Sequence, residues 1–306
     1  MALGDPLPEN IKQPVRQAAS SLCIERLARL GYAAKGLVYF IVGLLAAQAA
    51  FGSGGKTTDT SGALETIVTQ PFGKFLLAIV TLGLIGYALW RFVQTIFHPE
   101  HSGKKMNAKR IAKRLGYAFS AIGYFSLAVT SIKIIIMGSS SSDSDSVEDW
   151  TIYFLNQPFG RWLVVLLGLT VIGVGISYLY QSYKGKFCNR FKLYQMSQTE
   201  QIWAMRLGRF GIAARGIVFG IIGIFMIVAA IQLDGTQARG LAGALAALAK
   251  QPFGPWILGV VALGLIAYGM YSVIEVAIDI LLIYKFADKK NTLLILLFIK
   301  NAKYLV

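Results

Sequence analysis

Six stretches of roughly twenty residues, each almost wholly apolar, limit what this chain can fold into. They lie at about 32–51, 73–97, 115–137, 160–180, 211–231 and 255–284. A helix of this length crosses a hydrocarbon core of about 30 Å. Composition agrees, because 55% of the 306 residues are hydrophobic and only 15% are charged, against about a quarter in soluble domains. The sequence therefore predicts an all-α membrane protein with six transmembrane helices.

Lysine and arginine are distributed unevenly among the loops. Most lie before the first stretch, between the second and third, between the fourth and fifth, and after the sixth. The other three loops hold Lys56, Lys74, Arg161, Arg239 and Lys250. This alternation follows the positive-inside rule, so we expect both termini in the cytoplasm. The net charge of +15 is then a topology signal, and we expect membrane lipids as partners and no nucleic acid.

A tetrapeptide, Gln-Pro-Phe-Gly, occurs three times, each time directly ahead of the second, fourth or sixth apolar stretch. The copies are Gln70, Pro71, Phe72 and Gly73; Gln157, Pro158, Phe159 and Gly160; and Gln251, Pro252, Phe253 and Gly254. A glycine that opens another helix precedes each copy at nearly the same distance, at Gly31, Gly116 and Gly211. The chain is therefore read as three copies of a two-helix unit.

These repeats set the predicted organisation. An N-terminal cytoplasmic segment (1–25) precedes repeat 1 (26–103), repeat 2 (104–192) and repeat 3 (193–284), and a basic cytoplasmic tail (285–306) follows. Because each unit holds two helices, all three insert in the same orientation. We expect them to be related by a pseudo-threefold axis along the membrane normal rather than by an inverted repeat.

A short segment with helical tendency precedes each tetrapeptide, at 62–69, 147–156 and 239–250. We expect Thr60 or Ser61 to cap the first of them, because hydroxyl side chains are favoured at helix N-caps. We interpret the segments as interfacial helices on the outer side, each followed by a kink. The tetrapeptides are then structural joints rather than ligand sites, with a positive φ expected at glycines such as Gly73 and Gly254.

The repeated pattern has a counterpart in a known family. Openings of the form Arg-x-Gly-Tyr-x-Ala-(Lys/Arg)-Gly, followed by Gln-Pro-Phe-Gly, resemble the bacterial membrane-protein family called domain of unknown function 1206. The resemblance covers about residues 26–280. It implies an architecture and a bacterial cytoplasmic membrane, or an internal membrane continuous with it. It implies no activity, substrate or catalytic residue.

Charged residues near the predicted membrane are the candidates for a site, because ionisable groups are costly there. They form a candidate inner-face charge cluster: Lys35, Arg91, Arg215, Glu275 and Asp279. One interpretation is that they are interfacial anchors or ion pairs whose long side chains reach water. The other is a charged cytoplasmic vestibule for an ion or an anionic ligand. We expect an ion pair between Lys35 or Arg215 and Glu275 or Asp279.

No pattern in the sequence indicates an enzyme, a cofactor or a metal. His98 and His101 are the only histidines, and two isolated cysteines, Cys23 and Cys188, fall short of a zinc site. Two function classes remain. The first is a structural or assembly bundle that binds lipids or other membrane proteins. The second is a small transporter or channel through the pseudo-threefold centre. Few polar residues lie within the helices, which favours the first class.

Overall fold

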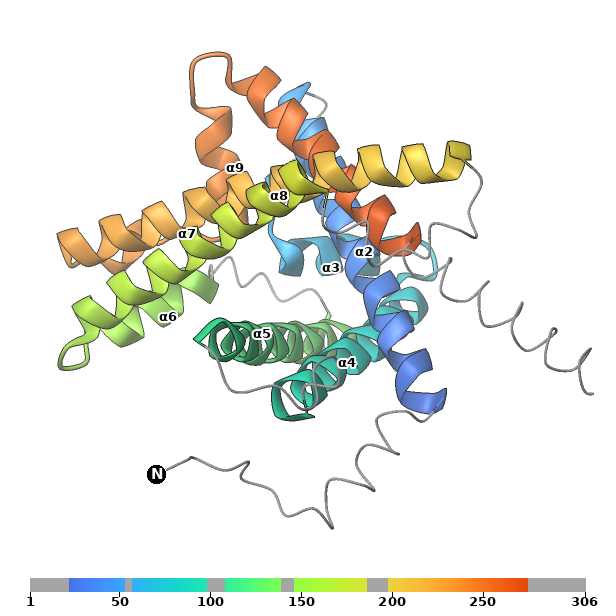
Figure 1. The fold of residues 1–306 in the computed structure, drawn as a ribbon, viewed down its shortest axis with the longest axis horizontal. Coiled ribbons are helices and arrows are strands. Elements are labelled where there is room, and N and C mark those ends of the chain that lie inside the picture. Colours follow the sequence, from blue (N-terminus) through green and yellow to red (C-terminus); the bar gives the residue numbers. More distant parts are fainter. Residues whose placement is uncertain (1–21, 53–56, 98–107, 139–145, 186–197, 275–306) are drawn as a thin grey trace, which may run out of the picture.

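Six long helices dominate the computed structural model (Figure 1). It describes residues 22–52, 57–97, 108–138, 146–185 and 198–274, which contain helices and turns but no strand. The long helices are α2 (Leu22–Ala50), α4 (Gly73–Phe97), α5 (Ala108–Met137), α7 (Gly160–Lys184), α8 (Gln198–Gln232) and an unlabelled last helix, Gly254–Ile274. Each is long and apolar enough to cross a membrane. The chain is thus a multi-pass membrane protein, as its apolar stretches predict.

A short helix precedes each Gln-Pro-Phe-Gly. These helices are α3 (Thr60–Val68), α6 (Ser146–Leu155) and α9 (Leu241–Ala249), with a 3-10 turn, η4 (Gly235–Gln237), before α9. The cap of α3 differs from the prediction, because the carboxylate of Asp59 accepts from the backbone N–H groups of Ser61 and Gly62, both at 2.9 Å. An ionised carboxylate makes a stronger cap than a hydroxyl. Two of the short helices are packed inward, since Leu64 of α3 and Leu245 of α9 are fully buried, whereas α6 has Trp150 and Tyr153 exposed.

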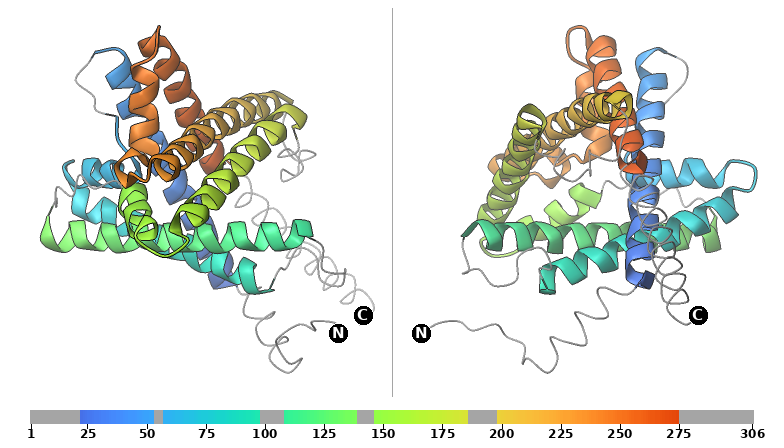
Figure 2. Two further views of the ribbon diagram at one scale, coloured as in Figure 1. Left: turned by 90° about the vertical axis from the view of Figure 1, so that its left-hand side faces the viewer. Right: turned by 45° about the vertical axis from the view of Figure 1, so that its right-hand side comes forward.

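The long helices form three antiparallel pairs, and each pair joins two different repeats. The first helix of repeat 2, α5, packs along α4, and the first helix of repeat 3, α8, packs along α7. The first helix of repeat 1, α2, packs along the last helix, with Gly36 against Gly269. The three pairs meet in the middle of the molecule and diverge as arms (Figures 1 and 2). The repeats therefore close into a ring, as a pseudo-threefold arrangement requires.

Equivalent small residues form the crossing in each arm. A Cβ on Gly36 would lie 2.8 Å from the carbonyl oxygen of Gly269, and one on Gly216 would lie 2.9 Å from that of Gly175. In the third arm the corresponding positions are buried alanines, Ala121 and Ala88. Small residues let helix backbones approach closely, which stabilises association where lipid supplies no hydrophobic driving force.

The side chain of Arg114, which opens repeat 2, contacts the end of the second helix of repeat 1. Arg114 donates from Nε to the carbonyl of Thr95 at 3.0 Å and from an Nη to that of Ile96 at 2.8 Å. These carbonyls belong to the last turn of α4, where a cation complements the helix dipole. At the next junction, the hydroxyl of Ser182 in α7 donates to the carbonyl of Arg209 at 2.7 Å. Hydrogen bonds near the helix ends therefore join neighbouring repeats, in addition to the contacts at the helix crossings.

Repeat 2 departs from the other two. Within repeats 1 and 3 the two helices pack tightly, so that a Cβ on Gly31 would lie 2.7 Å from the backbone nitrogen of Tyr87. The equivalent Cβ on Gly211 would lie 2.5 Å from the backbone nitrogen of Tyr268. In repeat 2, α5 and α7 hardly touch, and nothing lies within 4 Å of a Cβ on Gly116. The ring is thus loosest between α5 and α7.

The Gln-Pro-Phe-Gly joints place the positive φ on phenylalanine, not on glycine as the sequence suggests. Phe72, Phe159 and Phe253 have φ of 59°, 64° and 61°. In the first joint the glycine N–H donates to the Gln70 carbonyl at 2.8 Å, which closes a tight turn. The glycine is needed instead because its Cα packs against the preceding short helix, where a Cβ would lie 1.7–2.3 Å from a carbonyl oxygen.

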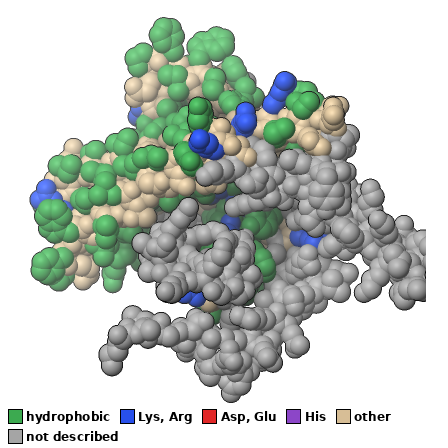
Figure 3. All heavy atoms as spheres, viewed as in Figure 1, with side chains coloured by type: hydrophobic (Ala, Val, Ile, Leu, Met, Phe, Trp, Pro, Cys, Tyr) green, Lys and Arg blue, Asp and Glu red, His purple; other side chains and the backbone are tan. Residues whose placement is uncertain are grey.

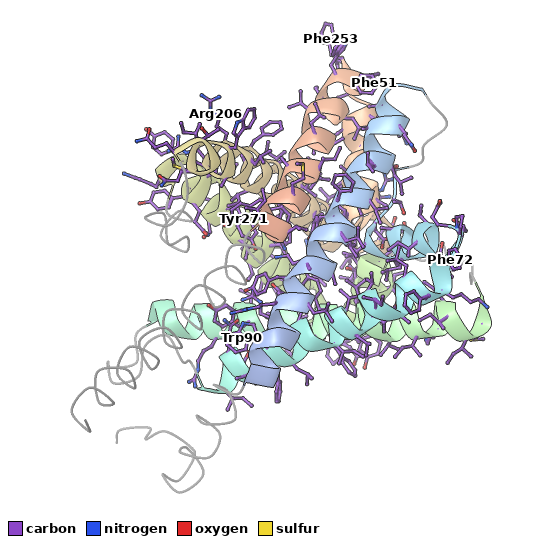
Figure 4. The ribbon with its side chains drawn as sticks, turned by 90° about the vertical axis from the view of Figure 1, so that its right-hand side faces the viewer. Phe51, Phe72, Trp90, Arg206, Phe253 and Tyr271 are labelled. Carbon is purple, nitrogen blue, oxygen red and sulfur yellow. The ribbon has the colours of Figure 1, made fainter. Side chains whose placement is uncertain are left out.

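The three phenylalanines point away from the protein. They are 80–88% exposed, and Figure 4 shows Phe253 and Phe72 at the tips of their arms. A bulky residue with positive φ carries backbone strain of about 1–3 kcal/mol. Their outward position beside the exposed Trp162 and Trp256 suits an aromatic belt at a membrane surface.

This strain predicts the effect of replacing Phe253 with asparagine, which tolerates the left-handed region. We expect Phe253→Asn to unfold in detergent at the same temperature as the wild type, or slightly above it. Phe225→Asn is the control, because that side chain packs against the core and its loss lowers the unfolding temperature. A clear loss of stability in Phe253→Asn would mean that the aromatic ring itself holds the joint.

Candidate functional site

Three cations and eight aromatic rings meet where the three arms converge. We term this group the central cluster, and its members come from all six long helices: Lys35, Arg91, Arg215, Tyr32, Tyr39, Tyr87, Tyr117, Tyr124, Tyr178, Phe219 and Tyr268. Figure 4 places Tyr271, which stacks near Tyr268, in the same region and far from the arm tips.

Lys35, on α2, is 4% exposed. Its Nζ lies 5.3 Å from the ring centroid of Tyr87 on α4 and 5.0 Å from that of Tyr268 on the last helix. Tyr32, one turn earlier on α2, adds a third ring at 5.8 Å. The ammonium is therefore held by the negative faces of aromatic rings, an attraction that strengthens when both partners leave water.

Arg215, on α8, is 8% exposed. Its guanidinium carbon lies within 5.1 Å of four ring centroids, those of Tyr39, Tyr178, Phe219 and Tyr268. One Nη donates a short hydrogen bond to the Tyr268 hydroxyl. Its Nε is buried without a hydrogen-bond partner. The guanidinium thus keeps one donor directed into the interior with nothing bound to it.

Arg91, on α4, is the third cation and is half-buried. Its Nε donates to the Tyr87 hydroxyl and one Nη donates to Oε1 of Gln94, both at 2.9 Å. The guanidinium carbon also lies 5.1 Å from the ring centroid of Tyr117 on α5. Tyr87 contacts both Arg91 and Lys35, and Tyr268 contacts both Lys35 and Arg215, so the three cations are linked through shared rings.

Members of the central cluster occupy equivalent positions in the three repeats. Counted from the opening glycine of each repeat, Lys35 corresponds to Ser120 and Arg215, and Tyr39 corresponds to Tyr124 and Phe219. In the second helices, Arg91 corresponds to Tyr178. These correspondences are visible in the sequence for most members. Tyr178 lacks such a signal, because its counterparts in the other repeats, Arg91 and Ser272, are of different types.

The structure differs from one part of the first interpretation of these cations. As interfacial anchors, Lys35 and Arg215 would extend their side chains to water, yet they are only 4% and 8% exposed. The helices extend beyond the apolar stretches, because α2 begins at Leu22 and α8 at Gln198. Both cations therefore lie well inside a helix, where aromatic rings bury them.

No carboxylate contacts Lys35, Arg91 or Arg215 in the part of the chain that the structure describes. Their polar and ring contacts there are to tyrosine, phenylalanine and Gln94. Glu275 and Asp279 lie outside the described residues, so the ion pair expected from the sequence stays a prediction. The described cluster carries three positive charges and no negative one.

Beyond the cluster, toward the tetrapeptides, the interior is apolar. Its fully buried members at that end are Ala46, Leu64, Leu77, Ile134, Leu245 and Leu258. Thr81 and Ser131, which are also buried, hydrogen-bond to each other across α4 and α5. The central cluster is therefore closed on one side by packed apolar side chains.

The described residues contain no group of three metal-binding side chains, and His98 and His101 lie outside them. A central cluster of cations and phenols instead suits the binding of an anion.

Comparisons with known proteins match this architecture. A family model described as Domain of Unknown Function (DUF1206) matches three times, at residues 30–98, 115–185 and 210–279. An uncharacterised protein of Bacillus subtilis (strain 168), YxxB, is 37% identical over 276 residues, which cover 90% of this chain and 96% of that protein. No solved structure matches the chain.

Proposed function

Because the chain belongs to the DUF1206 family, whose description names no activity, we propose its function from the central cluster: the protein binds an anionic ligand at the centre of its transmembrane bundle. The observation that carries this proposal is the burial of Lys35 and Arg215 beside Arg91 with no carboxylate in contact among the described residues. The proposed function is binding, not catalysis.

The energetic argument rests on the low polarity of the surroundings. Taking a cation out of water costs several kcal/mol unless an opposite charge or strong hydrogen bonds compensate. A ring face supplies about 2 kcal/mol to a desolvated cation, but the rings carry no net charge, so the three neighbouring positive charges still repel one another. A bound anion would supply the missing charge, and ionisable groups inside a membrane commonly mark such sites.

The donors of the central cluster suit a ligand with several oxygen atoms. A guanidinium presents its N–H groups in a planar fork that matches carboxylate and phosphate oxygens. The Nε of Arg215 has no partner, and the ammonium of Lys35 adds up to three donors. These groups favour an oxyanion.

The apolar interior on the tetrapeptide side supports binding over conduction. An ion path needs polar groups or water along its length, and the fully buried side chains packed there are mainly leucine, isoleucine and alanine, with Thr81 and Ser131 hydrogen-bonded to each other. We propose that the site faces the ends of the helices that carry the basic loops. By the positive-inside rule these ends are cytoplasmic, in a bacterial cytoplasmic membrane.

Replacing Lys35 with methionine tests the proposal. The full chain, purified in neutral detergent, is titrated with phosphatidylglycerol and, separately, with inorganic phosphate while its thermal unfolding is followed. At about a hundred times Kd, we expect at least one anion to raise Tm by about 4 °C. Lys35→Met should lose this rise, yet unfold at a higher temperature than the wild type without added anion, because an uncompensated charge is gone.

The control is Lys74→Met, since Lys74 is exposed and lies outside the central cluster. It should keep the full response to the anion. Equal responses in Lys35→Met and the wild type would contradict the proposal. So would a loss of stability in Glu275→Gln that Lys35→Met restores, because Glu275 would then be the missing counter-charge.

A further inference from the structure

We infer that the anion is the phosphate group of a membrane lipid, which enters the central cluster from the side, between α5 and α7. This inference rests on the proposed function and adds the class of ligand and its path. It draws on the asymmetry of the ring, in which repeat 2 is built differently from repeats 1 and 3.

The first observation is the loose packing of repeat 2. Its two long helices hardly touch each other, whereas the helices of repeat 1 are closely packed. A Cβ added to Gly116 or Gly123 on α5, or to Gly173 on α7, would meet nothing within 4 Å. The spans of repeat 2 are 22% and 17% buried, against 44–61% for the other four. The ring is therefore weakest between α5 and α7, where a lipid could separate these helices.

The second observation is the exposure of the aromatic rings on this side. Tyr117, Tyr124 and Tyr178, which repeat 2 contributes to the central cluster, are all half-buried. In contrast, Tyr87 and Tyr268 of repeats 1 and 3 are 1% and 6% exposed. Tyr32 and Phe219 are also half-buried, so repeats 1 and 3 each contribute both buried and partly exposed rings, whereas every ring from repeat 2 is partly exposed.

The third observation is the uneven distribution of the cations among the repeats. Repeats 1 and 3 supply all three cations, and repeat 2 has Ser120 at the position of Lys35 and Arg215. The guanidinium of Arg215 reaches α7, at 5.0 Å from the Tyr178 ring centroid. Arg215, whose Nε has no hydrogen-bond partner, and Lys35 therefore belong to a cluster to which repeat 2 adds rings but no charge. An anion that approached from the side of repeat 2 would be attracted by Lys35 and Arg215.

The outward faces of α5 and α7 favour a lipid over a dissolved anion. Large apolar side chains face outward on both helices, with Ile122 and Phe125 of α5 66% and 61% exposed and Ile176 of α7 61% exposed. Figure 3 shows hydrophobic side chains along the arm formed by α7 and α8. Acyl chains can pack against these faces while the headgroup phosphate reaches the cations. A free ion in water gains nothing from the apolar faces.

The decisive variant is Ser120→Glu, with Ser120→Gln as the matched control. Ser120 lies between Tyr117 and Tyr124 on one face of α5, because residues three and four apart are neighbours on a helix. Glutamate there supplies the carboxylate that the described cluster lacks. We expect Ser120→Glu to raise Tm without lipid and to lose the rise caused by phosphatidylglycerol. Ser120→Gln should keep that lipid response.

Three additives identify the source of the phosphate: phosphatidylglycerol, inorganic phosphate, and diacylglycerol with the same acyl chains. A saturable rise in Tm of about 4 °C with phosphatidylglycerol alone supports the inference. An equal rise with inorganic phosphate overturns the lipid inference and leaves the proposed function standing. No rise with either anion overturns both. An equal rise with diacylglycerol shows that the phosphate is not recognised and also overturns the inference.

The path is tested on the wild-type chain, so the result does not depend on how Ser120→Glu folds. Phosphatidylglycerol that carries a photoreactive diazirine on an acyl chain is bound in detergent and activated, and the labelled peptides are identified by mass spectrometry. Labelling of α5 and α7 that excess phosphatidylglycerol competes away supports lateral entry. Competed labelling confined to α2 and α4 would place the lipid elsewhere and overturn it.

Discussion

Gly160→Ala is expected to lower the unfolding temperature by more than about 6 °C, which corresponds to more than about 3 kcal/mol. A Cβ on Gly160 would lie 1.7 Å from the carbonyl oxygen of Phe154 and 2.7 Å from its carbon. Both atoms are backbone atoms of the short helix α6, so no side-chain rotation relieves the overlap. Either α6 must move away from α7 or the joint must open.

Gly173→Ala on the same helix is the matched control. Nothing lies within 4 Å of a Cβ there, and alanine is favoured over glycine in a helix by about 1 kcal/mol. We expect its unfolding temperature to equal or exceed that of the wild type. Thermal unfolding of both variants in one detergent makes the comparison direct. If Gly160→Ala were as stable as Gly173→Ala, the close approach at the joint would not exist in solution.

The second large effect is expected from the opening glycines. Gly211→Ala places a Cβ 2.5 Å from the backbone nitrogen of Tyr268 and 2.6 Å from its Cα. Forcing α8 and the last helix apart should lower Tm by about 4 °C, as overpacking costs about 1–3 kcal/mol. Because Tyr268 contacts both Lys35 and Arg215, the response to the bound anion should weaken as well.

Gly116→Ala serves as its control, since Gly116 holds the same place in repeat 2 and has open space around it. It should unfold at the wild-type temperature or above and should keep its response to the anion. The measurements are thermal unfolding with and without phosphatidylglycerol. Equal losses in the two variants would show that repeat 2 packs as tightly as the others and that α5 and α7 are in close contact.

The sequence predicts the helices and the repeat well because both depend on local information. An apolar run of membrane length favours one structure, a spanning helix, and three identical tetrapeptides mark the same junction. The turn at this junction is less accessible to sequence reasoning. Glycine tolerates a positive φ most easily, so the sequence favours Gly73, yet Phe72 adopts it. The outcome depends on how closely the preceding short helix packs, which the sequence does not contain.

The central cluster is only partly visible in the sequence. Lys35 and Arg215 stand out as charges in apolar segments, and their shared position in the repeat links them. Their burial depends on the closure of α2 onto the helix Gly254–Ile274, a contact between repeats 1 and 3 that are far apart in the sequence. Tyr178 gives no signal, because no single repeat pattern includes it. Contacts that depend on ring closure are therefore the ones that local sequence features do not determine.

The order of pairing has a consequence for biogenesis. Ribosomes deliver α2 to the membrane before its partner in the ring, the helix Gly254–Ile274, because four other long helices lie between them in the sequence. Until then the crossing glycine Gly36 has no partner, and Lys35 lacks the ring of Tyr268. The crossing of α2 with this helix thus forms only after all six described long helices have been made, and a buried lysine must be accommodated in the translocon or in lipid meanwhile. Contacts between segments far apart in the sequence are slow to form, so we expect this crossing to be a late step in the assembly of the ring.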